Sequence, residues 1–292
     1  LHRILDRGFP LKRVKFMYYF LGGLPMLEEF EAHLRRSNLS ENTISSYLLT
    51  IRMYQQLSGE ITKQNLLAFK GYLVETYKPK TVNLRIQAIN KYLEFIKKDK
   101  LRLAPVKIQQ KNFLENVISD ADYKFLKNCL KRDKNWEWYF VVRYLAATGA
   151  RVSELIQIKV EHVFNGYFDL YSKGGKLRRL YIPKKLKIET EVWLNEKGIT
   201  SGYLFLNRFG NRITVRGISQ QLKNYAHKYG LNPKVVYPHS FRHRFAKNFL
   251  EKYNDISLLA DLMGHESIET TRIYLRKTAS EQQEIVDKVV TW

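Results

Sequence analysis

The feature that most constrains the fold of this chain is the recurrence of apolar residues at helical spacing over most of its length. In the stretch LSENTISSYLLTIRMYQQL, apolar residues recur every three or four positions, and Ser40 followed by Glu41 is a typical helix start. Further helices are predicted over 26–34 and after Thr62. Another presents one apolar face, made of Val82, Ile86, Ile89, Leu93 and Ile96.

A basic segment without a regular period divides this pattern into two parts. Residues 97–116, KKDKLRLAPVKIQQKNFLEN, contain a proline and show no helical face, which is typical of an interdomain linker. We therefore expect a helical domain over 26–98, a basic linker over 99–118 and a mixed domain over 119–292. Ser119, with an acidic residue three positions later, predicts the first helix of that second domain.

The first 25 residues do not share this organisation. They are basic and then apolar, similar to a weak signal peptide, but the apolar run is short and lacks a small-residue cleavage site. We interpret residues 1–25 as an N-terminal extension, a candidate non-native segment, with folding beginning near Met26.

In the second domain, two turn signals interrupt the helical pattern. Asn165-Gly166 lies between apolar runs and predicts a two-residue β-hairpin turn. The run Lys173-Gly174-Gly175-Lys176 predicts another tight turn, which leads into a strand over 177–182. Helices are predicted over 120–131, 135–147, 184–196, 214–229, 239–251, 255–263 and 267–277. The expected fold class is mainly α with a small antiparallel β-sheet.

The charge balance indicates a polyanionic partner. Fifty Lys and Arg residues face 28 Asp and Glu residues, which gives a formal net charge of +22. Such an excess indicates nucleic acid or an acidic membrane surface as the partner. Nucleic acid is favoured because no apolar stretch is long enough to span a bilayer. Scattered basic residues usually lie on solvated surfaces, but together with the net charge several in the first domain are candidate phosphate contacts: Arg35, Arg36, Lys78, Lys80 and Arg85.

Cysteine and histidine usage narrows the class further. A single cysteine, Cys129, excludes an internal disulfide framework, fits a reducing cytosol and lies in an apolar helical pattern, where a buried thiol is expected. The seven histidines are not at metal-ligand spacing, so neither a metal nor a cofactor is expected.

Several segments carry residues suited to phosphodiester chemistry without a metal. Such chemistry needs guanidinium groups on the non-bridging oxygens, a proton for the leaving oxygen, and a side-chain nucleophile if the bond energy is to be conserved. The candidates, in chain order, are Arg151, Lys173, His239, Arg242, His265 and Tyr274.

Each candidate alone has an ordinary structural explanation. Arg151 could simply pair with Glu154 on a surface turn, and Lys173 could be a solvated lysine of a glycine-rich turn. Tyr274 is one of 19 tyrosines. His243 is expected to lie off the helix face that carries the preceding histidine and arginine, as an ordinary helix residue.

Taken together, the wording and order of these segments resemble the tyrosine recombinase, or phage integrase, family. The matching text is TGARVSEL, the lysine-bearing β-turn, HSFRHRFA and LMGHESIETTRIYL. The resemblance covers nearly the whole chain. The first domain is similar to the family's helical, SAM-like core-binding domain, and residues 119–292 are similar to its α+β catalytic domain. The chain length, with no room for an arm-binding domain before residue 26, favours a compact Xer-like or transposon-type member.

The resemblance implies a role for each candidate. Tyr274 would attack the scissile phosphate to give a 3′-phosphotyrosyl bond, and Arg151 and Arg242 would hold the non-bridging oxygens. Lys173 would protonate the leaving 5′ oxygen. His239 would assist proton transfer from the tyrosine. The remaining candidate, His265, would hydrogen-bond the phosphate, whereas Glu154 would brace the turn at Arg151. No ATP or metal would be required.

The resemblance also implies an assembly. Family members act as homotetramers on two double-stranded DNA sites, and a C-terminal helix docks onto a neighbouring subunit. The amphipathic segment Ala279–Trp292 is the candidate for that docking; the alternative is that it packs on its own domain. The expected location is cytoplasmic and nucleoid-associated, without a membrane partner.

Two other functions stay open at this stage. A type IB topoisomerase uses the same arginine, lysine, histidine and tyrosine chemistry, although the compact first domain and the wording GHESIETTRIY favour a recombinase. A non-catalytic DNA-binding protein would explain the charge but not the six candidates in family order. Integration, excision and dimer resolution share one chemistry and are not distinguished.

Overall fold

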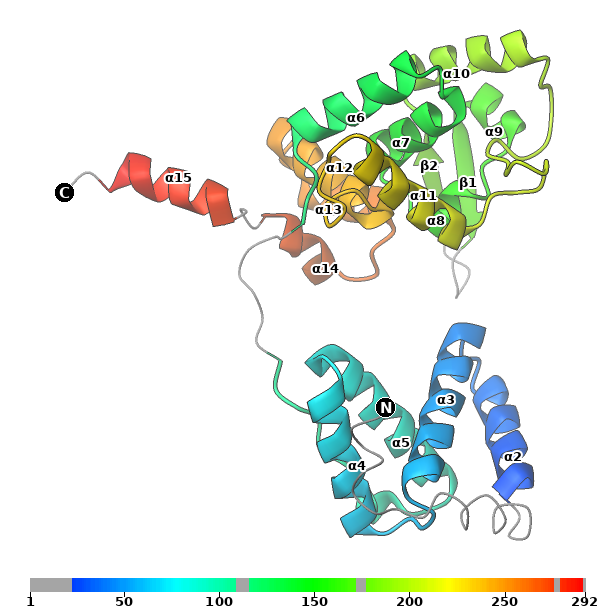
Figure 1. Ribbon diagram of the computed structural model, residues 1–292, viewed down its shortest axis with the longest axis vertical. Coiled ribbons are helices and arrows are strands. Elements are labelled where there is room, and N and C mark those ends of the chain that lie inside the picture. The colour runs from blue at the N-terminus through cyan, green and yellow to red at the C-terminus, as the bar shows by residue number, and fades with distance from the viewer. Residues whose placement is uncertain (1–22, 109–115, 172–176, 276–278, 291–292) are drawn as a thin grey trace. The chain divides into compact units, whose positions relative to one another are not determined.

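The computed structural model describes residues 23–108, 116–171, 177–275 and 279–290, which form two compact units divided near Gln110 (Figure 1). The first unit consists of helices and one short 3₁₀ turn. Its elements are α2 (Gly23–Arg36), α3 (Glu41–Leu57), α4 (Lys63–Thr76), α5 (Pro79–Phe95) and η1 (Asp99–Leu101). The helix starts follow the sequence signals: the Ser40 side chain accepts from the Thr43 amide, and Thr62 caps α4 in the same way.

The apolar faces of these helices form a single core, in which Phe30, Leu34, Ile51 and Leu73 are fully buried. This burial stabilises helices that would be marginal alone in water. The four described α-helices of this unit therefore pack as one body around a common core.

Residues 101–106 were expected to belong to the linker, yet they lie along the first unit. Asn90 and Asn83 act as amide clamps: each exchanges two hydrogen bonds of 2.8–2.9 Å with the backbone of Leu103 and Val106, respectively. Leu103 is buried in the helical core. A basic, aperiodic sequence can therefore be ordered when side-chain amides from neighbouring helices satisfy its backbone groups.

The second unit combines helices with one β-hairpin. The helices are α6 (Asp120–Arg132), α7 (Trp136–Thr148), α8 (Val152–Leu155), α9 (Val160–Asn165), α10 (Lys184–Lys197), α11 (Val215–Lys228), α12 (Pro238–Lys252), α13 (Ile256–Met263), α14 (Ile268–Arg272) and α15 (Ala279–Val289), with a 3₁₀ turn, η2 (Ile273–Leu275). Most side chains of helix α7 are apolar and buried, which fits its place between α6, α8, α10 and α12. The strands β1 (Tyr167–Tyr171) and β2 (Leu177–Tyr181) pair antiparallel. The mainly α fold with a small antiparallel sheet is confirmed.

Two local predictions in this unit were wrong. Asn165-Gly166 is not a hairpin turn: Gly166, with φ of 80°, is the C-cap of the unpredicted helix α9, because a helix end and a hairpin turn need the same left-handed backbone. The predicted helix over 267–277 stops being α-helical at Arg272 and tightens into η2. The hairpin's own turn, residues 172–176, lies outside the described residues, as does the predicted extension up to residue 22.

Within the described residues, no helix is long and apolar enough to cross a membrane. Cys129 is buried, as expected.

Candidate active site

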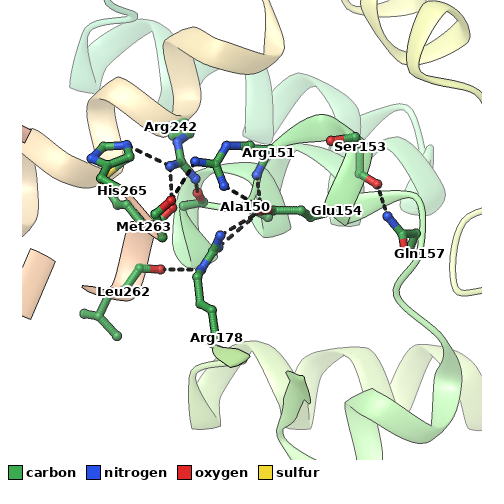
Figure 2. A network of polar contacts seen from close by, with 12 residues as sticks. Ala150, Arg151, Ser153, Glu154, Gln157, Arg178, Arg242, Leu262, Met263 and His265 are labelled. Atoms are coloured by element: carbon green, nitrogen blue, oxygen red, sulfur yellow. Dashed lines mark hydrogen bonds and ion pairs between the residues drawn. The ribbon is translucent and has the colours of Figure 1, made fainter. Parts of the chain in front are cut away.

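The site is formed where α8, β2, α12 and the end of α13 meet, and Figure 2 shows its polar network. Gly149 leaves α7 with φ of 63°, and a Cβ there would lie 2.5 Å from the ring of Phe245 on α12. Only glycine therefore allows α7 and α12 to approach this closely. The next turn places Arg151 at the N-cap of α8.

Glu154 holds the Arg151 turn from two directions. One carboxylate oxygen accepts from the Arg151 backbone N–H at 2.7 Å, and the other accepts from its guanidinium at 2.9 Å. The expected bracing role is confirmed. Nη2 of Arg151 still reaches across to the carbonyl of Gly264, at 2.9 Å, so the arginine is not confined to a surface ion pair.

Arg242 is the most deeply placed charge of the site. It is 1% exposed and donates to the carbonyls of Gly149 and Met263, while its Nη2 also lies 3.0 Å from Nε2 of His265. Burial and the nearby Arg151 lower the pKa of Arg242 to about 10, so the guanidinium stays charged at neutral pH.

The contacts of His265 define its tautomer. An arginine can only donate, so Nε2 of His265 must accept from Arg242, and Nδ1 then carries the proton and donates to Thr271 Oγ1 at 2.8 Å. Burial, then Arg242 and Arg151, lower the pKa of His265 to about 4, and the ring is neutral near pH 7. Thr271 is fully buried and belongs to the Thr-Thr pair of the sequence motif, whose contribution the sequence alone did not explain.

Tyr274 lies in η2 and is 4% exposed. Its ring stacks at 6.1 Å on His265, and the ring of His243 lies 5.2 Å away. Burial raises the pKa of the Tyr274 phenol, while Arg242, through its charge and a side-chain hydrogen bond, opposes that rise. The phenol is therefore buried and protonated, but it lies beside the positive charge that its ionised form needs.

His243 was expected to lie off the functional face of α12, and that prediction was wrong. Its ring contacts His239, one helical turn earlier, at 4.3 Å, as well as Tyr274. Residues four apart share a helix face, which is the physical reason. Burial and then His239 lower the pKa of His243 to about 4, and its Nδ1 is buried without a hydrogen-bond partner among the described residues.

His239 is the second residue of α12, after Pro238, and is exposed. Desolvation of the ring, then Arg242 and Arg151, lower its pKa, so it is neutral and able to accept a proton at neutral pH. Lys173 lies outside the described residues.

A third arginine, Arg178 of β2, completes the cluster and was not found from the sequence. Its guanidinium forms two hydrogen bonds to the carboxylate of Glu154 and one to the carbonyl of Leu262. The sequence contains one signal that could have found it, the predicted strand LRRLY. Side chains alternate between the two faces of a strand, so only one of Arg178 and Arg179 can point toward the core.

The site therefore holds three guanidiniums against one carboxylate. Within the described ranges, no group of three or more His, Cys, Asp or Glu side chains is placed to bind a metal ion. Such a cluster is suited to an anion with several oxygens, and a buried tyrosine lies beside it.

Comparison with known proteins agrees with this chemistry. Residues 115–281 match the model of the phage integrase family. Tyrosine recombinase XerA of Pyrococcus furiosus is 31% identical over 272 residues, which cover 90% of this chain and 93% of that protein. The TnP I resolvase of Bacillus thuringiensis is 26% identical over 276 residues, which cover 86% of this chain and 95% of that protein. The structure of the Tn1549 transposon integrase in complex with circular intermediate DNA shares the fold, with a TM-score of 0.68 at 17% identity, over 91% of this chain and 99% of that one. The chain belongs to the phage integrase family and is a tyrosine recombinase, an enzyme that cleaves and rejoins DNA strands.

Proposed function

We propose that the protein recombines specific DNA sites through a 3′-phosphotyrosyl bond to Tyr274, in integration or excision of a mobile element or in dimer resolution. The observation that carries this proposal is a buried tyrosine next to an arginine cluster that lacks balancing negative charge. Glu154 bonds Arg151 and Arg178, and Arg242 bonds backbone carbonyls, so one carboxylate stands against three guanidiniums among the described residues. A scissile phosphate supplies the missing negative charge, and its two non-bridging oxygens match the donors of Arg151 and Arg242.

The neighbours of Tyr274 supply a path for its proton. The tyrosine Oη attacks phosphorus, the bond to the 5′ oxygen breaks, and the phenolic proton must leave during the attack. His239 is neutral, and its ring contacts His243, which contacts Tyr274. We propose His239 as the acceptor of that proton, while the arginines lower the cost of the phenolate. Lys173 is proposed as the acid that protonates the leaving 5′ oxygen.

His265 changes role when phosphate arrives. With Nε2 accepting from Arg242, the ring cannot donate to an oxygen. A phosphate that takes over the Arg242 donors frees Nε2, and its negative charge raises the pKa of His265. The imidazolium then donates to phosphate while Thr271 keeps the ring oriented.

We assign part of the DNA backbone contact to the helical unit. Arg36, Lys78 and Lys80 are exposed there and can reach phosphate. Arg35 must first exchange Glu31 and Glu41, its carboxylate partners, for phosphate. Arg85 is the weakest of these candidates because its Nη1 already donates to the Ser46 carbonyl of α3.

The assembly we propose is a homotetramer on two double-stranded sites, linked by the C-terminal helix in trans. Ile285, Val286, Val289 and Val290 are each 45–60% exposed, an apolar group that a neighbouring subunit would cover. Removal of residues 279–292 is expected to leave DNA binding by one subunit intact and to abolish the four-subunit complex in native gels. A protein with this activity acts on the nucleoid.

The central test uses a suicide duplex. Sites are first enriched from random duplexes by binding, and the enriched site is then synthesised with a nick beside the scissile phosphate. The wild-type chain should form a covalent adduct on denaturing gels, and Tyr274→Phe should bind the same duplex without forming one. An adduct with Tyr274→Phe would show that another residue is the nucleophile. Efficient relaxation of plasmids that lack the site would instead indicate a type IB topoisomerase.

A further inference from the structure

The C-terminal end of α13 presents three consecutive backbone carbonyls, and each accepts a hydrogen bond from a different arginine (Figure 2). The pairs are Leu262 with Arg178 Nε at 2.9 Å, Met263 with Arg242 Nη2 at 2.6 Å, and Gly264 with Arg151 Nη2 at 2.9 Å. The last carbonyls of a helix lack intrahelical partners and carry the negative end of its dipole, so this helix end attracts and orients guanidinium groups.

Arg178 differs from the other two arginines in what remains available on its guanidinium. All three of its nitrogens already donate: Nε to Leu262, and Nη1 and Nη2 to the two carboxylate oxygens of Glu154. Its side chain is only 10% exposed, against 42% for Arg151. Arg242, in contrast, has an Nε without a partner among the described residues. Arg178 is therefore suited to hold other groups in place rather than to contact phosphate.

Gly264 shows how closely Arg178 approaches the turn after α13. This glycine has φ of 62°, and a Cβ at this position would lie 2.5 Å from Cδ of Arg178 and 2.9 Å from its Nη1. The absence of a side chain thus lets the guanidinium lie directly against the turn that carries His265 and leads to Tyr274.

We infer that Arg178 is a positioning residue for strand cleavage. It fixes Glu154, which orients Arg151, and it fixes the Leu262 carbonyl, which holds the turn that precedes His265. One side chain of β2 thereby links the hairpin to the segment that carries the proposed nucleophile. The inference rests on the function proposed above for Tyr274.

Arg178 also sets the ionisation of Glu154. Burial raises the pKa of this carboxyl, but Arg178 above all, and then the backbone N–H and side chain of Arg151, bring it below its usual value. Loss of Arg178 should raise that pKa. The carboxyl would then protonate at higher pH. In a plot of cleavage rate against pH, the fall in rate on the acid side should therefore begin at a higher pH.

The test compares Arg178→Met with Arg179→Met. Arg179 is the next residue of β2 but lies on its other face, where it pairs with Asp169 at the surface. Both changes remove one charge from the same strand. At saturating suicide duplex, Arg178→Met should form the covalent adduct about 100-fold more slowly at unchanged DNA affinity, because a small misplacement of reacting groups has about this effect. Its acid limb should move to higher pH, whereas Arg179→Met should stay within about twofold of wild type in rate.

Two further measurements separate positioning from other roles. With a neutral methylphosphonate at the scissile position, the defect of a phosphate-contacting arginine shrinks, but the Arg178→Met defect should persist. Arg178→Lys keeps the charge but cannot bond Glu154 and Leu262 together. Arg178→Lys should regain part of the cleavage rate. If circular dichroism shows that Arg178→Met does not fold, the rate, pH and methylphosphonate measurements are made on Arg178→Lys instead.

Wild-type cleavage rates in Arg178→Met and Arg178→Lys would overturn the inference. So would a cleavage defect that follows a loss of DNA affinity, or one that disappears with the methylphosphonate substrate. Absence of an adduct with the wild-type chain would instead overturn the proposed function, and the positioning role with it. An adduct that forms with Arg178→Met at the same rate as with wild type would overturn only the positioning role.

Discussion

The arginines of the two units are used in opposite ways. In the helical unit, Arg35 is exposed between two carboxylates, and Arg85 bonds a backbone carbonyl and a hydroxyl of α3. In the catalytic unit, Arg242 is buried and bonds backbone carbonyls, while Arg151 and the half-buried Arg178 share Glu154. In the DNA-free chain, Arg35 of the first unit is held by surface ion pairs and Arg85 by packing against α3. The second unit concentrates positive charge that a phosphate can balance, and backbone carbonyls hold that charge in place until DNA binds.

The largest test of this difference is Arg242→Gln. Loss of the buried guanidinium should lower the rate of adduct formation about 10²–10³-fold, since a donor aimed at developing charge contributes about this much. Arg244→Gln, two residues along α12, is the matched control because Arg244 pairs with Asp120 and covers the ring of Tyr123. A loss below tenfold in Arg242→Gln, measured on the suicide duplex, would mean that this arginine does not hold the phosphate.

Acid should destabilise the catalytic unit more than the helical unit. The pKa of His243 is lowered from 6.5 to about 4 in the folded chain, so the unfolded chain binds more protons between these values. Stability is complete above pH 6.5 and falls as the pH drops toward 4, by up to about 3 kcal/mol from this group. Amide hydrogen exchange in α12, corrected for intrinsic rates, should report the loss.

The control for this pH dependence is His243→Phe, which keeps a ring beside Tyr274 but cannot titrate. The free energy of unfolding should then fall less steeply as the pH drops, but it should still fall, because the lowered pKa of His265 acts in the same direction. An unchanged slope would contradict the assignment to His243.

A smaller effect is expected in the helical unit. Arg85→Met removes hydrogen bonds of 2.9 and 2.8 Å to the Ser46 carbonyl and the Thr50 hydroxyl, and should destabilise the α3–α5 packing by about 1–2 kcal/mol. Faster hydrogen exchange in α3 and α5, with adduct formation by bound protein unchanged, is the expected result. Arg52→Met, at an exposed position of α3, is the control and should change neither. If Arg85→Met weakened DNA binding without any change in exchange, Arg85 would be a phosphate contact instead.

The smallest effects concern single exposed lysines. Lys78→Gln and Lys80→Gln should each weaken DNA binding modestly and reduce the slope of log affinity against log salt by about 1. Lys63→Gln is the control because the Lys63 ammonium donates to the backbone carbonyl of Arg102 at 3.1 Å. If the slope of log affinity against log salt were the same in all three variants, Lys78 and Lys80 would not contact phosphate.

Much of the site could be predicted from the sequence because its signals are local. Ser267 caps α14, and Gly264 ends α13 in the left-handed conformation, which are the positions that serine and glycine favour at helix ends. Together with the family wording, these signals identified Arg151, Arg242 and Tyr274 as candidates, and the structure brings the three side chains into one cluster. The wrong predictions arose where one local signal serves two structures, as at Gly166, or where a helix face was assigned incorrectly, as at His243.

The sequence by itself determined the helical architecture, the excess of positive charge and the residue types of a phosphodiester chemistry, because capping, periodicity and composition act over a few residues. Only the tertiary structure decided that the end of α13 meets three arginines from α8, β2 and α12, since those contacts join residues 21 to 113 positions apart. The same folding buried Tyr274 beside Arg242 and fixed the tautomer of His265. Burial and partner geometry exist only once the chain has packed, so the roles of Arg178, Thr271 and His243 could not be read from their neighbours in the sequence.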